Sequence, residues 1–202
     1  MWGFIRFSKH LIFLLLVTLG GYYTYMTYPV KHGPGIMAPE APKLKSLSFV
    51  KTINFQDRDL QPYARFHATA RILSKKWYFL DDKADVSPFD IVIGWGPMSD
   101  ERNLQFIFID QSNRTYSCNT THPPIKRSAI NQNTMNIHLV PRGSLLSGKL
   151  WKLRPGDIID IQGDLVLEQN QPLQLWNRTS QALRNRDLDS STLLVKSITV
   201  HN

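Results

Sequence analysis

The side chains best suited to acid–base chemistry are one histidine and two aspartates. His138 interrupts the apolar run NIHLVP, and Asp90 and Asp100 lie in the stretch SPFDIVIGWGPMSDER. A histidine whose ring is oriented by a carboxylate can act as a general base in hydrolysis. His138 with Asp90 or Asp100 is therefore the candidate catalytic group. The alternative is a structural role, because a histidine in an apolar strand is more often a hydrogen-bonded residue of the core.

Motifs for several other chemistries are missing from the chain. His67, His122 and His138 are scattered over three segments, without the i, i+4 spacing of paired metal ligands. Cys118 is the single cysteine, so neither an intrachain disulfide nor a cysteine-based zinc site can form within one chain. There is no Gly-x-Ser-x-Gly nucleophile motif and no phosphate-binding glycine loop. We therefore expect no metal and no cofactor.

The stretch SPFDIVIGWGPMSDER is largely explained by turns and helix caps. Ser87, followed by a proline and then an aspartate, predicts the start of a short helix that ends at Gly94. The next Gly-Pro pair prevents continuation, and Ser99 or Asp100 can cap a second short helix that begins near Glu101. Trp95 and Met98 have no such local role, so they are the candidate binding residues of this stretch.

The motif GWGPMSD, together with NIHLVP and the RPGD turn, resembles the pattern of a group of bacterial proteins with an N-terminal membrane anchor. That group is of similar length and has no assigned activity. The likeness covers most of the chain from Phe66 to Leu167. It implies a bacterial protein of the cell envelope, and it provides no catalytic residue to carry over.

The N-terminus has the layout of a single membrane helix. Leu11 to Tyr28 contains 18 residues without a charge, which as a helix would extend about 27 Å. Arg6 and Lys9 precede this segment, tyrosines crowd its far end and Pro29 closes it. Because positive charges stay on the cytoplasmic side, we expect a single pass through a bacterial inner membrane, with the N-terminus in the cytoplasm and the main domain in the periplasm. The alternative is a cleaved signal peptide, although the segment lacks an Ala-x-Ala cleavage site.

This composition divides the chain into three parts. Residues 1–28 are a cytoplasmic stub and membrane anchor. Residues 29–46 are rich in proline and glycine and have no apolar period, which is typical of a semi-extended tether. Residues 47–202 are the exported domain.

The exported domain has an α+β pattern made mostly of strands. Over residues 66–72, apolar residues alternate with polar ones such as Arg71, which predicts a strand with one wet face. Helical patterns occur near 127–133 and 144–153. Gly163, inside a later strand, indicates a bulge or sharp bend. We expect a small β-barrel or a strongly curved antiparallel sheet with two or three short helices, and OB-like folds are the nearest precedent.

The net charge of +8 is weak support for nucleic-acid binding. Half of it comes from the first 45 residues, which hold five basic residues and one acidic residue. In the rest of the chain, Lys and Arg are spread among Asp and Glu instead of forming one patch. Nucleic acid is therefore not an expected partner, and an extracytoplasmic nucleic-acid binding module stays only as an alternative.

The anchor, the tether, the strand-rich domain and the lack of a catalytic motif favour a binding protein. We expect a membrane-anchored accessory protein of the bacterial cell envelope that contacts another envelope protein or a cell-wall component, rather than an enzyme. The alternative is an envelope hydrolase in which His138 acts with Asp90 or Asp100, near Trp95.

Overall fold

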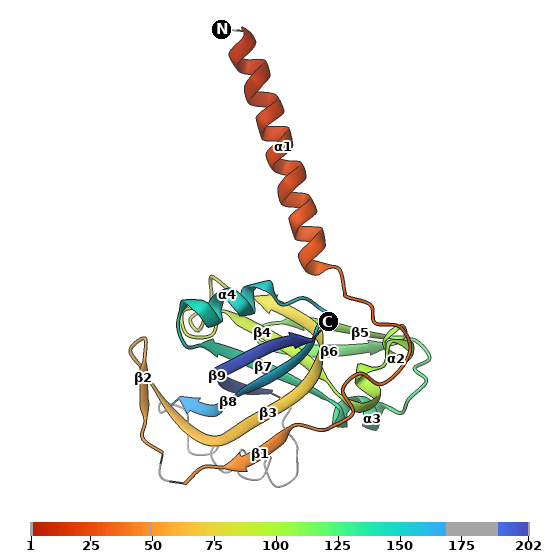
Figure 1. Ribbon diagram of the computed structural model, residues 1–202, viewed down its shortest axis with the longest axis vertical. Helices are drawn as coiled ribbons and strands as arrows, with labels where there is room; N and C mark the ends of the chain where they lie inside the picture. Colours follow the sequence, from red (N-terminus) through yellow and green to blue (C-terminus); the bar gives the residue numbers. More distant parts are fainter. Residues whose placement is uncertain (1, 49, 169–189, 202) are drawn as a thin grey trace.

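A long helix and a strand-rich domain make up the chain (Figure 1). The computed structural model describes residues 2–48, 50–168 and 190–201. The predicted α+β class is confirmed, and so are the helices near 127–133 and 144–153. The helices are α1 (Trp2–Thr27), the 3-10 helix η1 (Gly96–Ser99), α2 (Glu101–Leu104), α3 (Arg127–Gln132) and α4 (Ser144–Lys152). The strands are β1 (Lys43–Ser46), β2 (Ile53–Phe55), β3 (Arg58–Trp77), β4 (Phe89–Gly94), β5 (Ile107–Ser112), β6 (Thr115–Thr120), β7 (Thr134–Pro141), β8 (Ile158–Glu168) and β9 (Ser190–His201).

α1 is long and apolar enough to cross a membrane. Its segment Lys9–Thr27 has 19 residues and a mean hydropathy of 1.2, and none of this segment is buried. Figure 1 shows the helix projecting away from the strands. A membrane anchor and a signal sequence share this length and composition, so the helix fits both of the alternatives drawn from the sequence.

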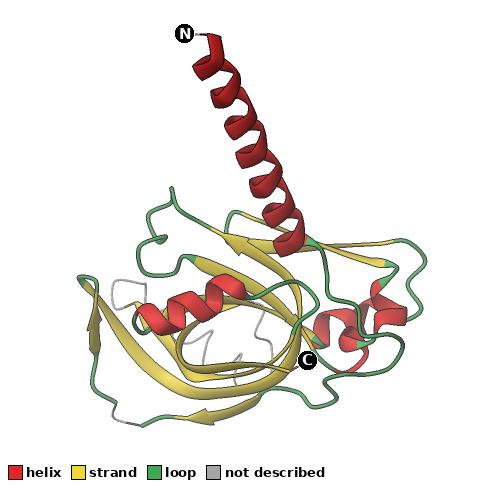
Figure 2. Ribbon diagram, turned by 45° about the horizontal axis from the view of Figure 1, so that its top comes forward, coloured by secondary structure: helices red, strands yellow, loops and turns green. Residues whose placement is uncertain are grey.

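The long strand β3 connects the two ends of the main sheet. It pairs with β8 over most of its length and with β4 near its end, and from β4 the order continues through β7 and β9 to β8. The ring of pairings therefore returns to β3. Only the pairing of β7 with β9 is parallel among those described. The result is a mostly antiparallel, strongly curved sheet (Figure 2).

Breaks in strand register accompany this curvature. The β3–β4 pairing shifts between Ile72 and Ser74, and the β8–β9 pairing shifts between Gln162 and Gly163. A side chain is not tolerated at Gly163, because a Cβ atom would lie 2.4 Å from the carbonyl oxygen of Leu194. The irregularity predicted at this glycine is confirmed.

The main hydrophobic core lies inside the curve of the sheet. On β3 the buried apolar residues alternate from Ala64 to Ile72, as the sequence pattern predicts. α4 lies across one opening of the sheet (Figure 2) and adds Leu150 to the core. Arg71 is buried as well, which corrects the wet face expected for it.

β4 is a strand where the sequence predicts a helix. Ser87 and the residues after it form a helix-start pattern, but Ile91, Val92 and Ile93 are β-branched and fully buried. Such side chains favour strands, and a strand covered on both faces takes a continuous apolar run. Burial on both faces therefore outweighs the local start signal.

A separate two-stranded sheet, β5 paired with β6, packs outside the main sheet. Its turn residues Asn113 and Arg114 have positive φ angles of 51° and 63°, the backbone of a tight two-residue hairpin turn. Gln111 Nε2 donates to Oδ1 of Asn136 on β7 at 3.1 Å. The hairpin thus lies over the outer side of β7.

Residues 29–46, named the strap from here on, lie against the domain. The amide of Val30 donates to the carbonyl oxygen of Pro155 at 2.8 Å, and His32 Nε2 lies 2.8 Å from the carbonyl oxygen of Gly156. At the far end of the strap, β1 pairs with β3. The segment predicted as a tether is extended, but the domain holds it at both ends.

Candidate functional site

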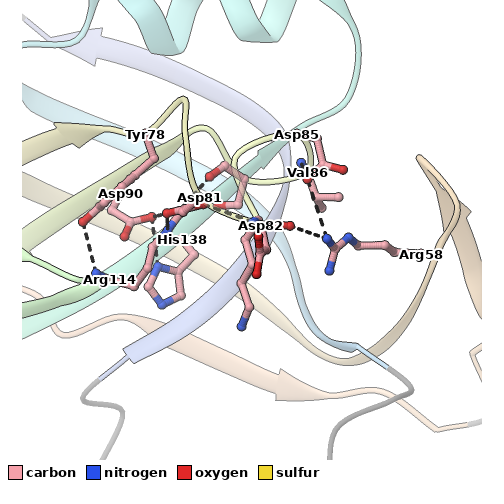
Figure 3. Close-up of polar contacts among 11 residues, drawn as sticks. Arg58, Tyr78, Asp81, Asp82, Asp85, Val86, Asp90, Arg114 and His138 are labelled. Carbon is pink, nitrogen blue, oxygen red and sulfur yellow. Dashed lines mark hydrogen bonds and ion pairs between the residues drawn. The ribbon is translucent and has the colours of Figure 1, made fainter.

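Asp90 and His138, two of the three candidate catalytic residues, lie side by side. They are direct partners in the β4–β7 register, and His138 Nδ1 lies 2.9 Å from Asp90 Oδ1 (Figure 3). The Asp90 side chain is completely buried, whereas 20 % of the His138 side chain is exposed. Strand pairing therefore holds a carboxylate against the ring of a histidine that still reaches solvent.

Arg114 is the third member of this group, and the sequence does not predict it. From the hairpin turn, its Nη1 donates to Asp90 Oδ1 at 2.9 Å, and its Nε and Nη2 donate to Asp81 at 2.7 and 2.6 Å. Its guanidinium lies 3.9 Å from the ring centroid of Tyr78. Burial acts to lower the pKa of Arg114, but Asp81 and Asp90 outweigh burial and raise it. Asp90, Arg114 and His138 are called the Asp90 cluster below.

The Asp90 cluster fixes the hairpin to the main sheet. Arg114 Nη1 also donates to the carbonyl oxygen of Ser87, at 2.7 Å. The carbonyl oxygen of Arg114 accepts a hydrogen bond from Asn136 Nδ2 at 3.1 Å. The turn residue thereby ties the hairpin tip to β4 and β7. This role is structural and needs no chemistry.

The contact between Asp90 and His138 pairs the same residue types as the carboxylate and histidine of a hydrolytic triad. In such a triad the buried carboxylate orients the histidine ring through one of its ring nitrogens. Asp90 Oδ2 and Ser87 Oγ are buried and have no hydrogen-bond partner among the described residues. Such oxygens are costly to bury, so Asp90 and the nearby Ser87 each keep a hydrogen-bonding oxygen that the hairpin does not use.

Asp100, the third candidate catalytic residue, has different partners. Its Oδ1 accepts from the amides of Gly35 and Arg102, each at 3.0 Å, and its Oδ2 forms an ion pair of 2.9 Å with Arg102. Hydrogen bonds from the Arg102 side chain, and then from the Gly35 amide, lower the pKa of Asp100 to about 2. Of the two caps that the sequence allows, Ser99 and Asp100, it is Asp100 that caps α2. Its contacts are with the strap and α2, and they do not include His138.

The neighbouring residues of the GWGPMSD motif also bind the strap. Ser99 Oγ accepts from the amides of Met37 and Ala38 at 3.1 and 3.0 Å, and the Gly96 amide donates to the Ala38 carbonyl oxygen at 2.7 Å. Gly96 has a φ of 52°, a conformation that favours glycine. The segment Gly96–Asp100, named the clasp, therefore holds the chain that leaves α1.

The two candidate binding residues both have packing roles. Met98 is fully buried in a small cluster with Ile107 and Ile130. Trp95 is partly buried and packs against the main core. A ligand-binding role for Trp95 or Met98 stays a prediction.

Arg71 is a buried cation that joins three parts of the chain. Its Nη2 donates to the Val30 carbonyl oxygen at 3.1 Å and to Glu101 Oε2 at 2.5 Å. Its Nη1 donates to the Ser99 carbonyl oxygen at 3.3 Å. Arg71 thus connects the strap, α2 and the clasp. Nothing in the sequence identifies this role, because the partners are distant along the chain.

Metal-binding geometry is not found in the described part of the chain. Within residues 2–48, 50–168 and 190–201, no group of three or more His, Cys, Asp or Glu side chains is arranged to hold a metal ion. His67 Nε2 lies 2.7 Å from Asp160 Oδ2 on the neighbouring strand β8. That contact is a cross-strand pair of the kind that stabilises a sheet.

The candidate residues take part in two groups of polar contacts. The Asp90 cluster carries acid–base groups. The clasp and Arg71 hold the strap, and with it the exit of α1, against the domain. Compared with protein-family models, with curated proteins and with solved structures, the chain shows no match.

Proposed function

We propose that the protein is a single-pass, membrane-anchored accessory protein of the bacterial cell envelope. α1 crosses the inner membrane with its N-terminus in the cytoplasm, and the sheet domain lies in the periplasm. There the domain binds another envelope protein or a cell-wall component. The observation that carries this proposal is the attachment of the domain to α1, because a binding domain held at one place on a membrane suits a partner in the same envelope.

The attachment begins before α1 ends. Trp151 Nε1, on α4, donates to the hydroxyl of Tyr22 at 3.1 Å. The guanidinium carbon of Arg154 lies 3.9 Å from the ring centroid of Tyr25, and its Nη2 donates to the carbonyl oxygen of Tyr28 at 3.1 Å. Together with the strap contacts, these interactions set the orientation of the domain relative to α1.

We interpret the ring of strands β3, β4, β7, β9 and β8 as an OB-like barrel. The pairings return to β3, and α4 lies between the third and fourth of these strands in chain order. OB folds commonly bind ligands on the face of their second and third strands. Here those strands are β4 and β7, and the β5–β6 hairpin packs over them. The outer face of β3 and β8 around Arg65 is therefore the proposed partner surface, because the strap and the clasp cover the same face of β3 at Arg71.

Photo-crosslinking in intact native cells tests this surface. A photoreactive amino acid in place of Arg65, whose side chain on β3 is 60 % exposed, is expected to give a discrete adduct with one partner. The same amino acid in place of Phe108, exposed on the hairpin, is the matched control. Equal adducts from both positions, or none from Arg65, would contradict a partner surface on β3 and β8.

The proposed topology is tested with reporters at the C-terminus of the full chain. Alkaline phosphatase, which is active only outside the cytoplasm, should be active in this fusion. A fluorescent protein that matures only in the cytoplasm should stay dark. The opposite pair of results would place the domain in the cytoplasm and contradict the proposal.

A second function, envelope hydrolysis, is favoured by the contact of 2.9 Å between His138 and Asp90. In that function His138 is the general base and Asp90 orients its ring. His138→Gln keeps a polar side chain but removes the base. If the protein is a binding protein, His138→Gln should retain native function and Arg65→Glu should lose it. If the protein is a hydrolase, His138→Gln should lose native function and Arg65→Glu should retain it. Circular dichroism of both variants checks that the fold is intact.

A further inference from the structure

Exposed apolar side chains lie on the side of the domain from which α1 leaves. Figure 1 shows α4 on that side. Leu80 is 88 % exposed and Leu145 is 86 % exposed, although both are large and apolar. Large exposed apolar side chains gathered on one side of a protein commonly mark an interaction site. The members of the group, named the membrane-side patch, are Trp77, Phe79, Leu80, Leu145 and Trp151.

Ring contacts join the end of β3 to α4 within the patch. The ring centroids of Trp77 and Trp151 are 4.5 Å apart in an edge-on arrangement. Those of Trp77 and Phe79 are 5.1 Å apart. Leu80 follows Phe79 in the chain, so the aromatic part of the patch continues directly into an exposed leucine.

The contact between α4 and α1 sets the height of the membrane-side patch along the axis of α1. Trp151 donates to the hydroxyl of Tyr22, which precedes the end of α1 at Thr27 by five residues. That spacing corresponds to about 8 Å along the helix axis. Tyrosine and tryptophan favour the headgroup region of a bilayer. Trp151 therefore lies at the level of the tyrosines that end α1, and these mark the membrane surface when α1 spans the bilayer.

Positive charge lies next to the patch on α4. Leu145, Lys149 and Lys152 are all exposed and follow the i, i+4, i+7 spacing of one helix face. α4 contains no acidic residue. In the loop after β3, Asp81 is paired with Arg114 at 2.6 Å and Asp85 lies 3.8 Å from Arg58, whereas Asp82 is exposed. Lysine stems can lie along an apolar layer while their ammonium groups reach lipid phosphates.

We infer that the membrane-side patch is seated in the headgroup layer of the membrane that α1 crosses, with the lysines of α4 contacting anionic lipid. This placement rests on α1 being a membrane helix, as proposed above, and it goes further by assigning one face of the domain to lipid. The occupant is lipid because the patch continues into the tyrosine end of α1 through Trp151 and Tyr22. The outer face of β3 and β8 is left for a protein or cell-wall partner.

Spin labels on the full chain in lipid nanodiscs test this placement. In a Cys118→Ser background, single labels are attached at Leu80→Cys and Leu145→Cys in the patch. The aqueous reference is Lys45→Cys on β1, which lies on the far side of the domain from α1 (Figure 1). The lipid reference is Leu15→Cys within α1. Each label is probed with oxygen, which partitions into lipid, and with a water-soluble nickel chelate, in phosphatidylcholine discs with and without phosphatidylglycerol.

We expect the Leu80 and Leu145 labels to show a several-fold higher ratio of oxygen to nickel accessibility than the Lys45 label. Removing phosphatidylglycerol should lower this ratio at Leu145, and an unchanged ratio would overturn the role of the lysines. Two results would overturn the lipid placement while the Leu15 label still reports lipid. In one, the patch labels have the same accessibility ratio as the Lys45 label. In the other, a covering protein shields the patch labels from both reagents. A Leu15 label in water would overturn the membrane anchor as well, which distinguishes the two failures.

Discussion

Asp90 and Asp100 are both buried carboxylates that hold a distant segment against the sheet, but they use different donors. Asp100 accepts hydrogen bonds from the backbone amides of Gly35 and Arg102, and it forms an ion pair with the Arg102 side chain. Asp90 is held by the side chains of Arg114 and His138, and its Oδ2 is buried without a hydrogen-bond partner among the described residues.

This difference separates an architectural carboxylate from one that retains chemical capacity. The backbone amides that donate to Asp100 are neither acids nor bases at neutral pH. Their hydrogen bonds can therefore hold the strap in place but cannot transfer a proton. Histidine is the side chain most often used for general acid–base catalysis, so the contact of His138 with Asp90 can support such chemistry as well as packing. The clasp is therefore assigned to attachment, and the Asp90 cluster is where an activity would have to be sought.

The largest difference is expected when each aspartate loses its arginine. Arg114→Ala leaves the buried Asp90 without this ion pair, so we expect the free energy of unfolding to fall by about 3–5 kcal/mol. Arg102 is 68 % exposed, and the backbone amides on Asp100 remain, so Arg102→Ala should lower the free energy of unfolding far less than Arg114→Ala does. Chemical denaturation of the full chain in detergent measures both losses. Equal losses would show that the two carboxylates are held alike.

A smaller effect is expected when the clasp loses one hydroxyl. Ser99→Ala removes the acceptor for the amides of Met37 and Ala38. The free energy that holds the strap against the domain should therefore fall by about 1–3 kcal/mol. Trypsin should then cleave faster at Lys31, which is exposed in the strap. The matched control is Ser87→Ala, because Ser87 Oγ has no hydrogen-bond partner among the described residues. The same cleavage rate in both variants would argue against the clasp.

The smallest effect is a pH dependence carried by Asp100. The pKa of its carboxyl is lowered from 3.8 to about 2 in the folded chain, mainly by Arg102 and then by the Gly35 amide. Because the folded value lies below the unfolded one, Asp100 adds stability that is fully present above the unfolded pKa and is lost as the pH falls through the folded pKa. Wild type should therefore lose thermal stability more steeply than Asp100→Asn across that window. Parallel slopes for the two proteins would contradict this role of Asp100.

The parts of the fold that the sequence predicts are those set by local patterns. The buried alternation from Ala64 to Ile72, the irregularity at Gly163 and the cap at Asp100 each follow from neighbouring residues. β4 is an element that the local pattern predicts wrongly. Its helix-start signal at Ser87 is local, whereas burial on both faces of the strand depends on segments from elsewhere in the chain.

The contacts that the sequence does not predict are those between remote residues. Arg71 reaches Val30, which is 41 residues away, and Arg114 reaches Asp90, which is 24 residues away. Alternation places Arg71 on a polar face but cannot show that another segment covers that face. For the same reason the composition of the strap predicts an extended chain, but not that Ser99 and Asp100 bind its amides.

Amide hydrogen exchange of residues 30–38, in the full chain in lipid nanodiscs, tests whether the strap fixes the domain to α1. The amides of Val30, Gly35, Met37 and Ala38 all donate to acceptors on the domain. We predict that these amides exchange orders of magnitude more slowly than those of an unstructured peptide with the same sequence. Exchange at the rate of the unstructured peptide would show that residues 29–46 are a free tether, and would contradict a domain held in place against α1.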